Sequence, residues 1–275
     1  MIPAGTQAPT RGWSMAAEAT LPTFSDQAGA ESSFSDRIAR LSNRIDYRIV
    51  DSGEEREAIF RLRYQAYIRD GAISPNSSGR FSDPYDETGN VYLFGLYIDD
   101  ELASSIRLHV ASRGHPVSPS LEVFADVLQP KLDVGKIIID TTHFVADENL
   151  ARLHRGLPYA TLRLCMLAAR YFKADHLLAA ASAAHQVFYQ RAFGYRLISE
   201  PRPYPLLAKS LGLMTVDYPA ARDQLYRRYP FFRSPFFERR MLFERPMAGS
   251  LQPGVSAVAG EDPPFVKPPA ASAAG

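Results

Sequence analysis

The first half of the chain alternates short apolar segments with polar turns. YRIV at 47–50 is rich in β-branched and aromatic residues, and so are NVYLFGLYI at 90–98 and LASSIRLHV at 102–110. Only Asp-Asp-Glu separates the last two segments, which predicts a β-hairpin. Residues 72–90 are rich in Pro, Asn, Ser, Gly and Asp, which predicts a loop before the hairpin.

One helix is predicted between the first strand and this loop. Residues 54–70 (EEREAIFRLRYQAYIRD) follow Ser52, and Glu55 lies three residues after that serine, as in a capping box. Gly71 follows directly, and helices commonly end at a glycine. The segment therefore carries both a start signal and a stop signal for a helix.

The second half repeats the alternation. KIIIDTTHFV at 136–145 is an apolar strand, and a helix over 157–174 begins with Pro158, which suits a first helical turn. The remaining predicted elements are a strand at 175–182, a helix at 185–194, and strands at 195–200 and 211–218. This order predicts an α/β (α+β) protein with a central mixed, twisted sheet and helices on both faces.

The two ends of the chain differ from this pattern in composition. Residues 1–44 are rich in Ala, Ser, Thr, Pro and Gly, and residues 247–275 form a Pro- and Ala-rich stretch. Such segments bury too little apolar surface to offset the entropy of ordering them. We therefore expect a disordered leader, one folded domain over 45–246, and a disordered tail.

Composition and charge narrow the function classes. The 275-residue chain is 46% hydrophobic with a net charge of +1, which is typical of a soluble globular protein and favours no nucleic-acid partner. Cys165 lies on the apolar stripe of a predicted helix and is expected in the core. The N-terminus lacks the apolar stretch of a secretory signal, so a cytoplasmic location is expected. The histidines show no metal-ligand spacing, so no metal site is expected.

Polar residues interrupt the strand KIIIDTTHFV at its centre. A buried carboxylate is costly unless it is hydrogen-bonded or shifts its pKa, so Asp140 has either a structural partner or a function. Asp140 and His143 lie three apart, which places them on opposite faces of the strand unless the strand bulges.

Arg107 is the candidate charged group of the hairpin. The alternation in SSIRLHV sends Ile106 and Leu108 to one face and Arg107 to the other. From this rigid support a guanidinium can hold a carboxylate through two hydrogen bonds. The alternatives are a solvated face or a brace for the loop DPYDETG, where Asp83 and Asp86 are also suited to cap a turn.

The order of elements resembles the GNAT superfamily of N-acyltransferases, whose fourth and fifth strands splay apart and admit a thioester carrier. KIIIDTTHFV stands at strand four, and HQVFYQRAFGYRLI resembles the helix-turn-strand after strand five. Four segments resemble, in order, motifs of acyl-homoserine-lactone synthases and long-chain N-acyl amino acid synthases: LRYQAYIRDG, DPYDETGN, SIRLHV and IDTTHFV. Two further segments are more similar to the N-acyl amino acid synthases than to the lactone synthases: LPYATLRL and YPFFRSPFFERRMLFER. The chain therefore resembles a long-chain N-acyl amino acid synthase.

The resemblance implies an enzyme that joins a long-chain fatty acyl thioester to the α-amine of an amino acid, with acyl-phosphopantetheine as co-substrate and no resident cofactor. An α-amine has a pKa of about 8 and must lose a proton, so a base is needed. Either Asp140 or His143 is the expected base, and Arg107 is expected to hold the acceptor carboxylate. The residues expected to bind the substrates are Arg63, Tyr67, Asp83, Asp86, Thr142, Phe144 and Val145.

The lactone synthases differ from this chain at the same positions. They usually carry Glu where Asp140 stands and Arg where His143 stands, and they place a Trp after the first helix, whereas the only Trp here is Trp13. An acyl-homoserine-lactone-type synthase is therefore an alternative rather than the expectation. The other alternative is a non-catalytic domain that binds lipids or amino acids.

Acyl carrier protein is the expected acyl donor. The stretch ADENLARLHRGLPYA has a single Gly156 and no glycine-rich nest for the pyrophosphate of coenzyme A. Basic residues around the helix that follows are expected to dock the acidic carrier: Arg152, Arg155, Arg163, Arg170 and Lys173. The run YPFFRSPFFERRMLFER is expected to fold back and shape an acyl-chain pocket, with peripheral membrane contact as the alternative.

Overall fold

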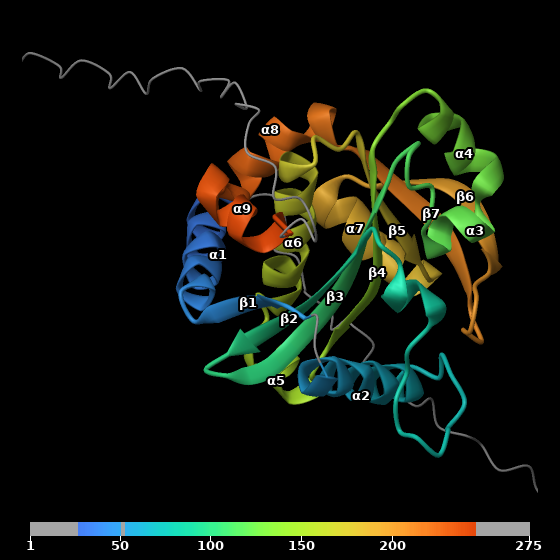
Figure 1. Cartoon of the computed structure of the whole chain (residues 1–275). Coiled ribbons are helices and arrows are strands. Elements are labelled where there is room, and N and C mark those ends of the chain that lie inside the picture. Colours follow the sequence, from blue (N-terminus) through green and yellow to red (C-terminus); the bar gives the residue numbers. More distant parts are fainter. Residues whose placement is uncertain (1–26, 51–52, 246–275) are drawn as a thin grey trace, which may run out of the picture. The chain divides into compact units, whose positions relative to one another are not determined.

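The computed structural model describes residues 27–50 and 53–245, which Figure 1 colours along the chain. Within them, seven strands form one sheet in the order β1-β2-β3-β4-β5-β7-β6. The strands are β1 (Ile45–Ile49), β2 (Val91–Ile98), β3 (Glu101–Ala111), β4 (Ile138–Ala146), β5 (His176–Ala181), β6 (Arg196–Pro203) and β7 (Ser210–Asp217). Strands β4 and β5 run parallel and the other neighbours run antiparallel, which confirms the predicted mixed sheet.

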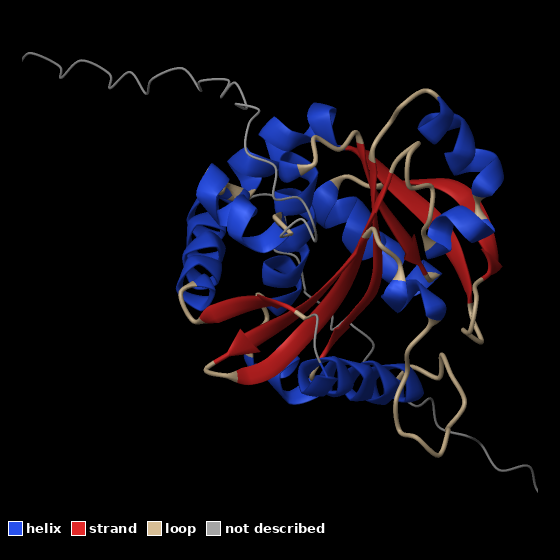
Figure 2. Ribbon diagram, in the orientation of Figure 1, coloured by secondary structure: helices blue, strands red, loops and turns tan. Residues whose placement is uncertain are grey.

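Helices cover both faces of this sheet (Figure 2). One face carries α2 (Gly53–Arg69), the 3₁₀ turn η1 (Pro84–Glu87), α3 (Pro119–Val123) and α4 (Ala125–Asp133). The other carries α1 (Gln27–Ser42), α6 (Leu157–Tyr171), α7 (Ala183–Phe193), α8 (Tyr218–Arg228), η2 (Pro230–Phe232) and α9 (Phe236–Phe243), and α5 (Glu148–Leu153) follows β4. Leu93 packs with α2 whereas Phe94 packs with α6, because successive strand residues point to opposite faces.

Strands β4 and β5 separate at their carboxyl ends, as predicted. Their pairing runs from Ile138 opposite His176 to Thr141 opposite Ala179 and then stops, although β4 continues to Ala146. The connection between them is α6, as a parallel pair requires. The backbone of β4 beyond Thr141 therefore has no β5 partner on that side.

A bulge in β4 changes the direction of one side chain. Arg107 of β3 pairs with Thr142 and Ser105 pairs with Val145, so two β4 residues face one residue of β3. His143 is one of the two and has a left-handed φ of 47°. Thr142 and His143, although adjacent in sequence, consequently both reach the α2 face.

The N-terminal part of the described chain is helical where the sequence predicted disorder. The prediction of disorder over 1–44 is wrong for the part that the structure describes, because α1 forms there and buries Ile38 and Leu41 in the core. These apolar residues, with Phe34, have helical spacing within a composition that otherwise suggests a linker. The capping box at Ser52 and the tail at 247–275 lie outside the described residues. The compact unit ends at Glu244.

None of the helices within residues 27–50 and 53–245 is long and apolar enough to cross a bilayer.

Candidate active site

The turn η1 carries two aspartates that cap it. Asp83 is its N-cap and accepts a hydrogen bond from the backbone N–H of Tyr85 at 2.9 Å, while Asp86 accepts one from the backbone N–H of Asp83 at 3.0 Å. The turn-capping interpretation of DPYDETG is therefore confirmed. Each carboxylate also has oxygens that point toward the sheet.

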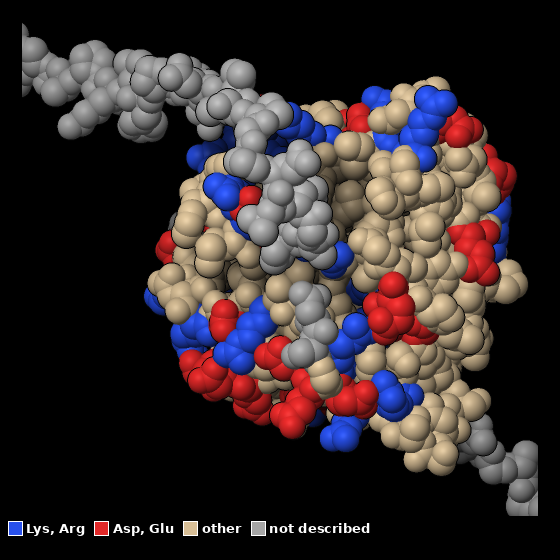
Figure 3. Space-filling model, viewed as in Figure 1, with Lys and Arg blue, Asp and Glu red and all other residues tan. Residues whose placement is uncertain are grey.

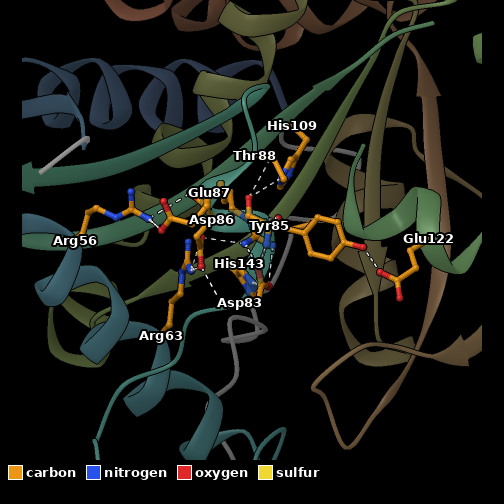
Figure 4. A network of polar contacts seen from close by, with 12 residues as sticks. Arg56, Arg63, Asp83, Tyr85, Asp86, Glu87, Thr88, His109, Glu122 and His143 are labelled. Atoms are coloured by element: carbon orange, nitrogen blue, oxygen red, sulfur yellow. Dashed lines mark hydrogen bonds and ion pairs between the residues drawn. The ribbon is translucent and has the colours of Figure 1, made fainter. Parts of the chain in front are cut away.

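Figure 4 shows Asp83 and Asp86 of this turn with Arg63 and His143 beside them. Arg107 on β3 is fully buried and braces the turn. Its Nη1 donates to Asp83 Oδ1 at 2.5 Å and to Asp86 Oδ1 at 2.9 Å, and its Nη2 donates to Asp83 Oδ2 at 3.0 Å. Its Nε donates to Thr142 Oγ1 at 3.0 Å. From α2, Arg63 donates to both oxygens of Asp86 at 2.9 Å. Two arginines and two aspartates thus balance in charge, which is the condition for keeping ionised groups inside a protein.

His143 links this network to Tyr67 of α2. Its Nε2 lies 2.7 Å from Asp83 Oδ2, and its Nδ1 lies 2.7 Å from Tyr67 Oη. An ionised carboxylate only accepts hydrogen bonds, so Nε2 carries the proton, and Tyr67 donates its hydroxyl proton to Nδ1.

The electrostatics keep this imidazole neutral. Burial, together with the positive charges of Arg107 and Arg63, lowers the pKa of His143 to about 3. Burial opposes ionisation of Asp83, but hydrogen bonds from His143 and Arg107 hold the pKa of that carboxyl well below its usual range. Burial raises the pKa of Tyr67. At neutral pH the three groups are therefore a phenol, an imidazole and a carboxylate.

A slot opens where β4 and β5 part. It holds about 130 Å³ and is lined on the β4 side by residues 141–146, on the β5 side by residues 180–182, and by Tyr67 of α2 and Tyr189 of α7. His143 and Tyr67 line it, and so do the predicted substrate-binding residues Thr142, Phe144 and Val145. The buried Arg63, Asp83, Asp86 and Arg107 lie behind this wall rather than in it.

A second, wider hollow adjoins the slot. It holds about 510 Å³ and is lined mainly by residues of the loop between α2 and η1, which include Ser74, Asn76 and Arg80. Phe81 forms part of its wall, and the ring of Phe81 lies 5.1 Å from the ring of Tyr67 and 5.5 Å from that of His143. The aromatic ring therefore stands between the hollow and the slot.

The loop before β7 also separates the two cavities. Leu206 lines the hollow and Leu207 lines the slot. Leu206 is 60% exposed with a left-handed φ of 62°, a strained conformation for a leucine. The backbone N–H of Ala208 donates to Ala72 O at 2.8 Å, which ties this loop to the start of the loop after α2.

Asp140 has a structural partner. Its Oδ2 accepts from the backbone N–H of Ser120 at 3.0 Å and its Oδ1 accepts from the Ser120 hydroxyl at 2.8 Å. Burial raises the pKa of this carboxyl, and the slot lining does not include it. Asp140 therefore anchors α3, and of the two bases that the sequence left open only His143 lines the slot.

The role predicted for Arg107 also changes. The side chain has no exposed surface, and its hydrogen bonds go to Asp83, Asp86 and Thr142. Of the interpretations left open by the sequence, the brace for the acidic loop is the one observed, and the solvated face is wrong. A direct grip on an acceptor carboxylate would need donors that Arg107 has already committed.

The predicted carrier-docking residues do not form one surface. Arg163 is 9% exposed and donates to the Phe231 carbonyl at 2.7 Å and to Glu238 at 2.9 Å, so its assignment to a docking face is wrong. Arg170 and Lys173 are exposed but lie at the far end of α6 from Arg152 and Arg155, about 22 Å away along a 15-residue helix. Arg152 and Arg155 follow the carboxyl end of β4, where the slot opens.

The C-terminal aromatic run folds back only in part. Phe232 and Phe243 are buried in the main core, whereas Phe236 and Phe237 are exposed, and none of the four lines the slot. The packing of this run on the domain is therefore confirmed in part, and its role in an acyl-chain pocket stays a prediction. The sequence also did not single out Arg80 and Phe81, whose only signal is an aromatic residue beside an arginine in a polar loop.

Comparison with known proteins places this geometry in context. The family model described as FeeM, N-acyl amino acid synthase, matches residues 58–217. The solved structure of FeeM, an N-acyl amino acid synthase from uncultured soil microbes, is similar with a TM-score of 0.56 and 19% identity over 70% of this chain and 99% of that chain. This likeness confirms the predicted acyltransferase-type fold. No curated protein matches the chain.

Two other solved structures have lower TM-scores, and one of them, BjaI, is an acyl-homoserine lactone synthase. BjaI, described as dependent on coenzyme A, has a TM-score of 0.48 and 16% identity over 64% of this chain and 83% of that chain. TofI, solved with an inhibitor, has a TM-score of 0.49 and 12% identity over 69% of this chain and 100% of that chain.

Proposed function

Because the chain belongs to the FeeM family of N-acyl amino acid synthases, we propose that it transfers a long-chain fatty acyl group from acyl carrier protein to the α-amine of an amino acid. The acyl-phosphopantetheine thioester is the co-substrate, and no other cofactor is needed. The observation that carries the proposal is the slot between β4 and β5 with His143 and Tyr67 in its wall.

The donor fits the slot. Beyond Thr141 the edge of β4 that faces β5 has unpaired backbone groups, and pantetheine carries amides that pair with such an edge. Ala180, Ala181 and Leu211 supply small or apolar walls opposite β4. The slot is too narrow to hold an amino acid beside the thioester.

The acceptor fits the hollow. Its lining of serines, asparagine and one arginine suits a zwitterion, and Phe81 places it next to the Tyr67–His143 pair. Arg80 pairs with Glu57 at 2.7 Å, and its Nε has no partner among the described residues. That nitrogen is buried, but the side chain as a whole is 39% exposed, so its outer N–H groups can meet an acceptor carboxylate in the hollow.

The proton path follows from the tautomer of His143. The neutral amine attacks the thioester carbonyl carbon, the C–N bond forms, and the nitrogen becomes acidic. Tyr67 accepts that proton as its own passes to His143 Nδ1, and Asp83 stabilises the imidazolium through Nε2. The C–S bond then breaks, and the same proton returns through Tyr67 to the leaving thiolate.

The carrier protein would dock beside the mouth of the slot. Arg152 and Arg155 are exposed there, and an acidic carrier surface is attracted by such cations over a Debye length. One phosphodiester enters with the carrier, so no pyrophosphate nest is required.

The direct test is synthesis. The protein is incubated with palmitoyl carrier protein and a mixture of the common amino acids, and N-acyl amino acids are sought by mass spectrometry while free thiol is titrated. We expect one or a few N-acyl amino acids formed in proportion to thiol. A protein that binds palmitoyl carrier protein but releases neither thiol nor amide would be a binding domain, and the proposal would be wrong.

Two variants tie the activity to the slot. Ala180→Phe fills the slot, and we expect it to abolish amide formation. Ala184→Phe adds the same ring on the exposed side of α7, outside the slot lining, and should be active. Equal activity of the two variants would place the thioester elsewhere.

A further inference from the structure

The last helix of the described chain leaves large apolar side chains in solvent. Phe236 is 59% exposed, Phe237 is 72% exposed and Met241 is 69% exposed. Phe232 and Phe243, from the same aromatic run, are buried in the core. The fold thus uses part of the run for packing and presents the rest outward.

The exposed residues form one face of α9. At 3.6 residues per turn, positions 236, 240, 237 and 241 fall in this order on one arc of about 140°. The opposite side is held to the domain by Leu242, which packs against the main core, and by Glu238, which accepts from Arg163 at 2.9 Å, while Phe243 borders the face and is buried. The face is therefore fixed in direction and convex, with Arg240 between the two phenylalanines.

Exposed arginines precede this face in the chain. Arg227, Arg228 and Arg233 are exposed just before α9, and Figure 3 shows basic side chains gathered over α8. The two glutamates of this segment are paired, Glu244 with Arg240 at 2.6 Å and Glu238 with Arg163, so these pairs add no net charge. The exposed charge that remains in this segment of the chain, from Arg227, Arg228 and Arg233, is positive.

We propose that the α9 face of Phe236, Phe237 and Met241 docks the protein on an anionic lipid surface. Aromatic rings beside guanidinium groups are the composition that suits a membrane interface, where the rings enter the headgroup boundary and the arginines contact lipid phosphates. A stable protein partner would need about 800 Å² on each side, more than one face of an eight-residue helix offers.

Sedimentation with lipid vesicles tests the proposal on the full chain. We expect binding to phosphatidylcholine vesicles that contain phosphatidylglycerol, weakening as salt rises, and little binding to phosphatidylcholine alone. Phe236→Ser with Phe237→Ser should lower binding at least tenfold, and Arg227→Gln or Arg233→Gln about fivefold each. Val134→Ser is the matched control, since Val134 is 74% exposed outside this face.

Three results would overturn the proposal. The full chain could fail to bind anionic vesicles, or the double phenylalanine variant could bind them as the parent does. The third is vesicle binding that appears only after removal of residues 246–275, which would make that segment the occupant of the face. Vesicle binding is measured without substrate, so the outcome does not depend on the proposed acyl transfer.

Discussion

Replacing Tyr67 with phenylalanine isolates the proposed proton path. The substitution removes one hydroxyl, whose oxygen lies 2.7 Å from His143 Nδ1, and keeps the ring that contacts Phe81 at 5.1 Å. Leaving a buried imidazole nitrogen unpaired should cost about 1–3 kcal/mol of stability, so the variant folds. If Tyr67 passes the proton, kcat should fall about 10²–10⁴-fold with little change in the donor KM.

The assay separates chemistry from stability. Thiol release from palmitoyl carrier protein is followed at saturating acceptor, and the melting temperature is measured on the same preparations. Tyr218→Phe is the control, because Tyr218 is also buried and hydrogen-bonded, at 2.9 Å to Tyr226, but lies on the other side of the sheet. It should lose stability and keep its kcat. A Tyr67→Phe enzyme with kcat within threefold of the parent would refute the relay.

Three further predictions concern charge. Arg107→Met should cost about 3–5 kcal/mol in urea unfolding, since it leaves Asp83 and Asp86 buried with one cation fewer, and a loss below 1 kcal/mol would contradict the brace. Burial lowers the pKa of His109 to about 3, so the free energy of unfolding should decrease as the pH falls below about 6.5. Between pH 7 and pH 5 the His109→Asn variant should lose about 2 kcal/mol less of this free energy than the parent, as measured by urea unfolding. Arg155→Glu should lower kcat/KM for acyl carrier protein in a salt-dependent manner, whereas Lys173→Glu at the other end of α6 should not.

The sequence predicted the sheet and its parallel pair because each strand has its own apolar period and turn signals. It did not predict α1, whose Ile38 and Leu41 are spaced as a helix but diluted by small polar residues. It placed Arg163 on a docking face because helical spacing shows which side of α6 the residue occupies, but not that α9 folds over that side. Contacts between segments far apart in sequence carry no local signal.

The polar run in β4 shows the same limit at the site itself. Asp140 bonds to Ser120 of α3, Thr141 lies 3.4 Å from Cys165 of α6, and Thr142 accepts from Arg107 of β3. Only His143 reaches across to α2, and regular alternation would have turned it toward α6 instead. The bulge at His143 therefore decides which of the four consecutive polar residues contacts α2 and lines the slot, and it is visible only in the pairing with β3. A strand predicted from its own sequence shows no such register shift, so Asp140 and His143 remain equal candidates for the base until the pairing with β3 is known.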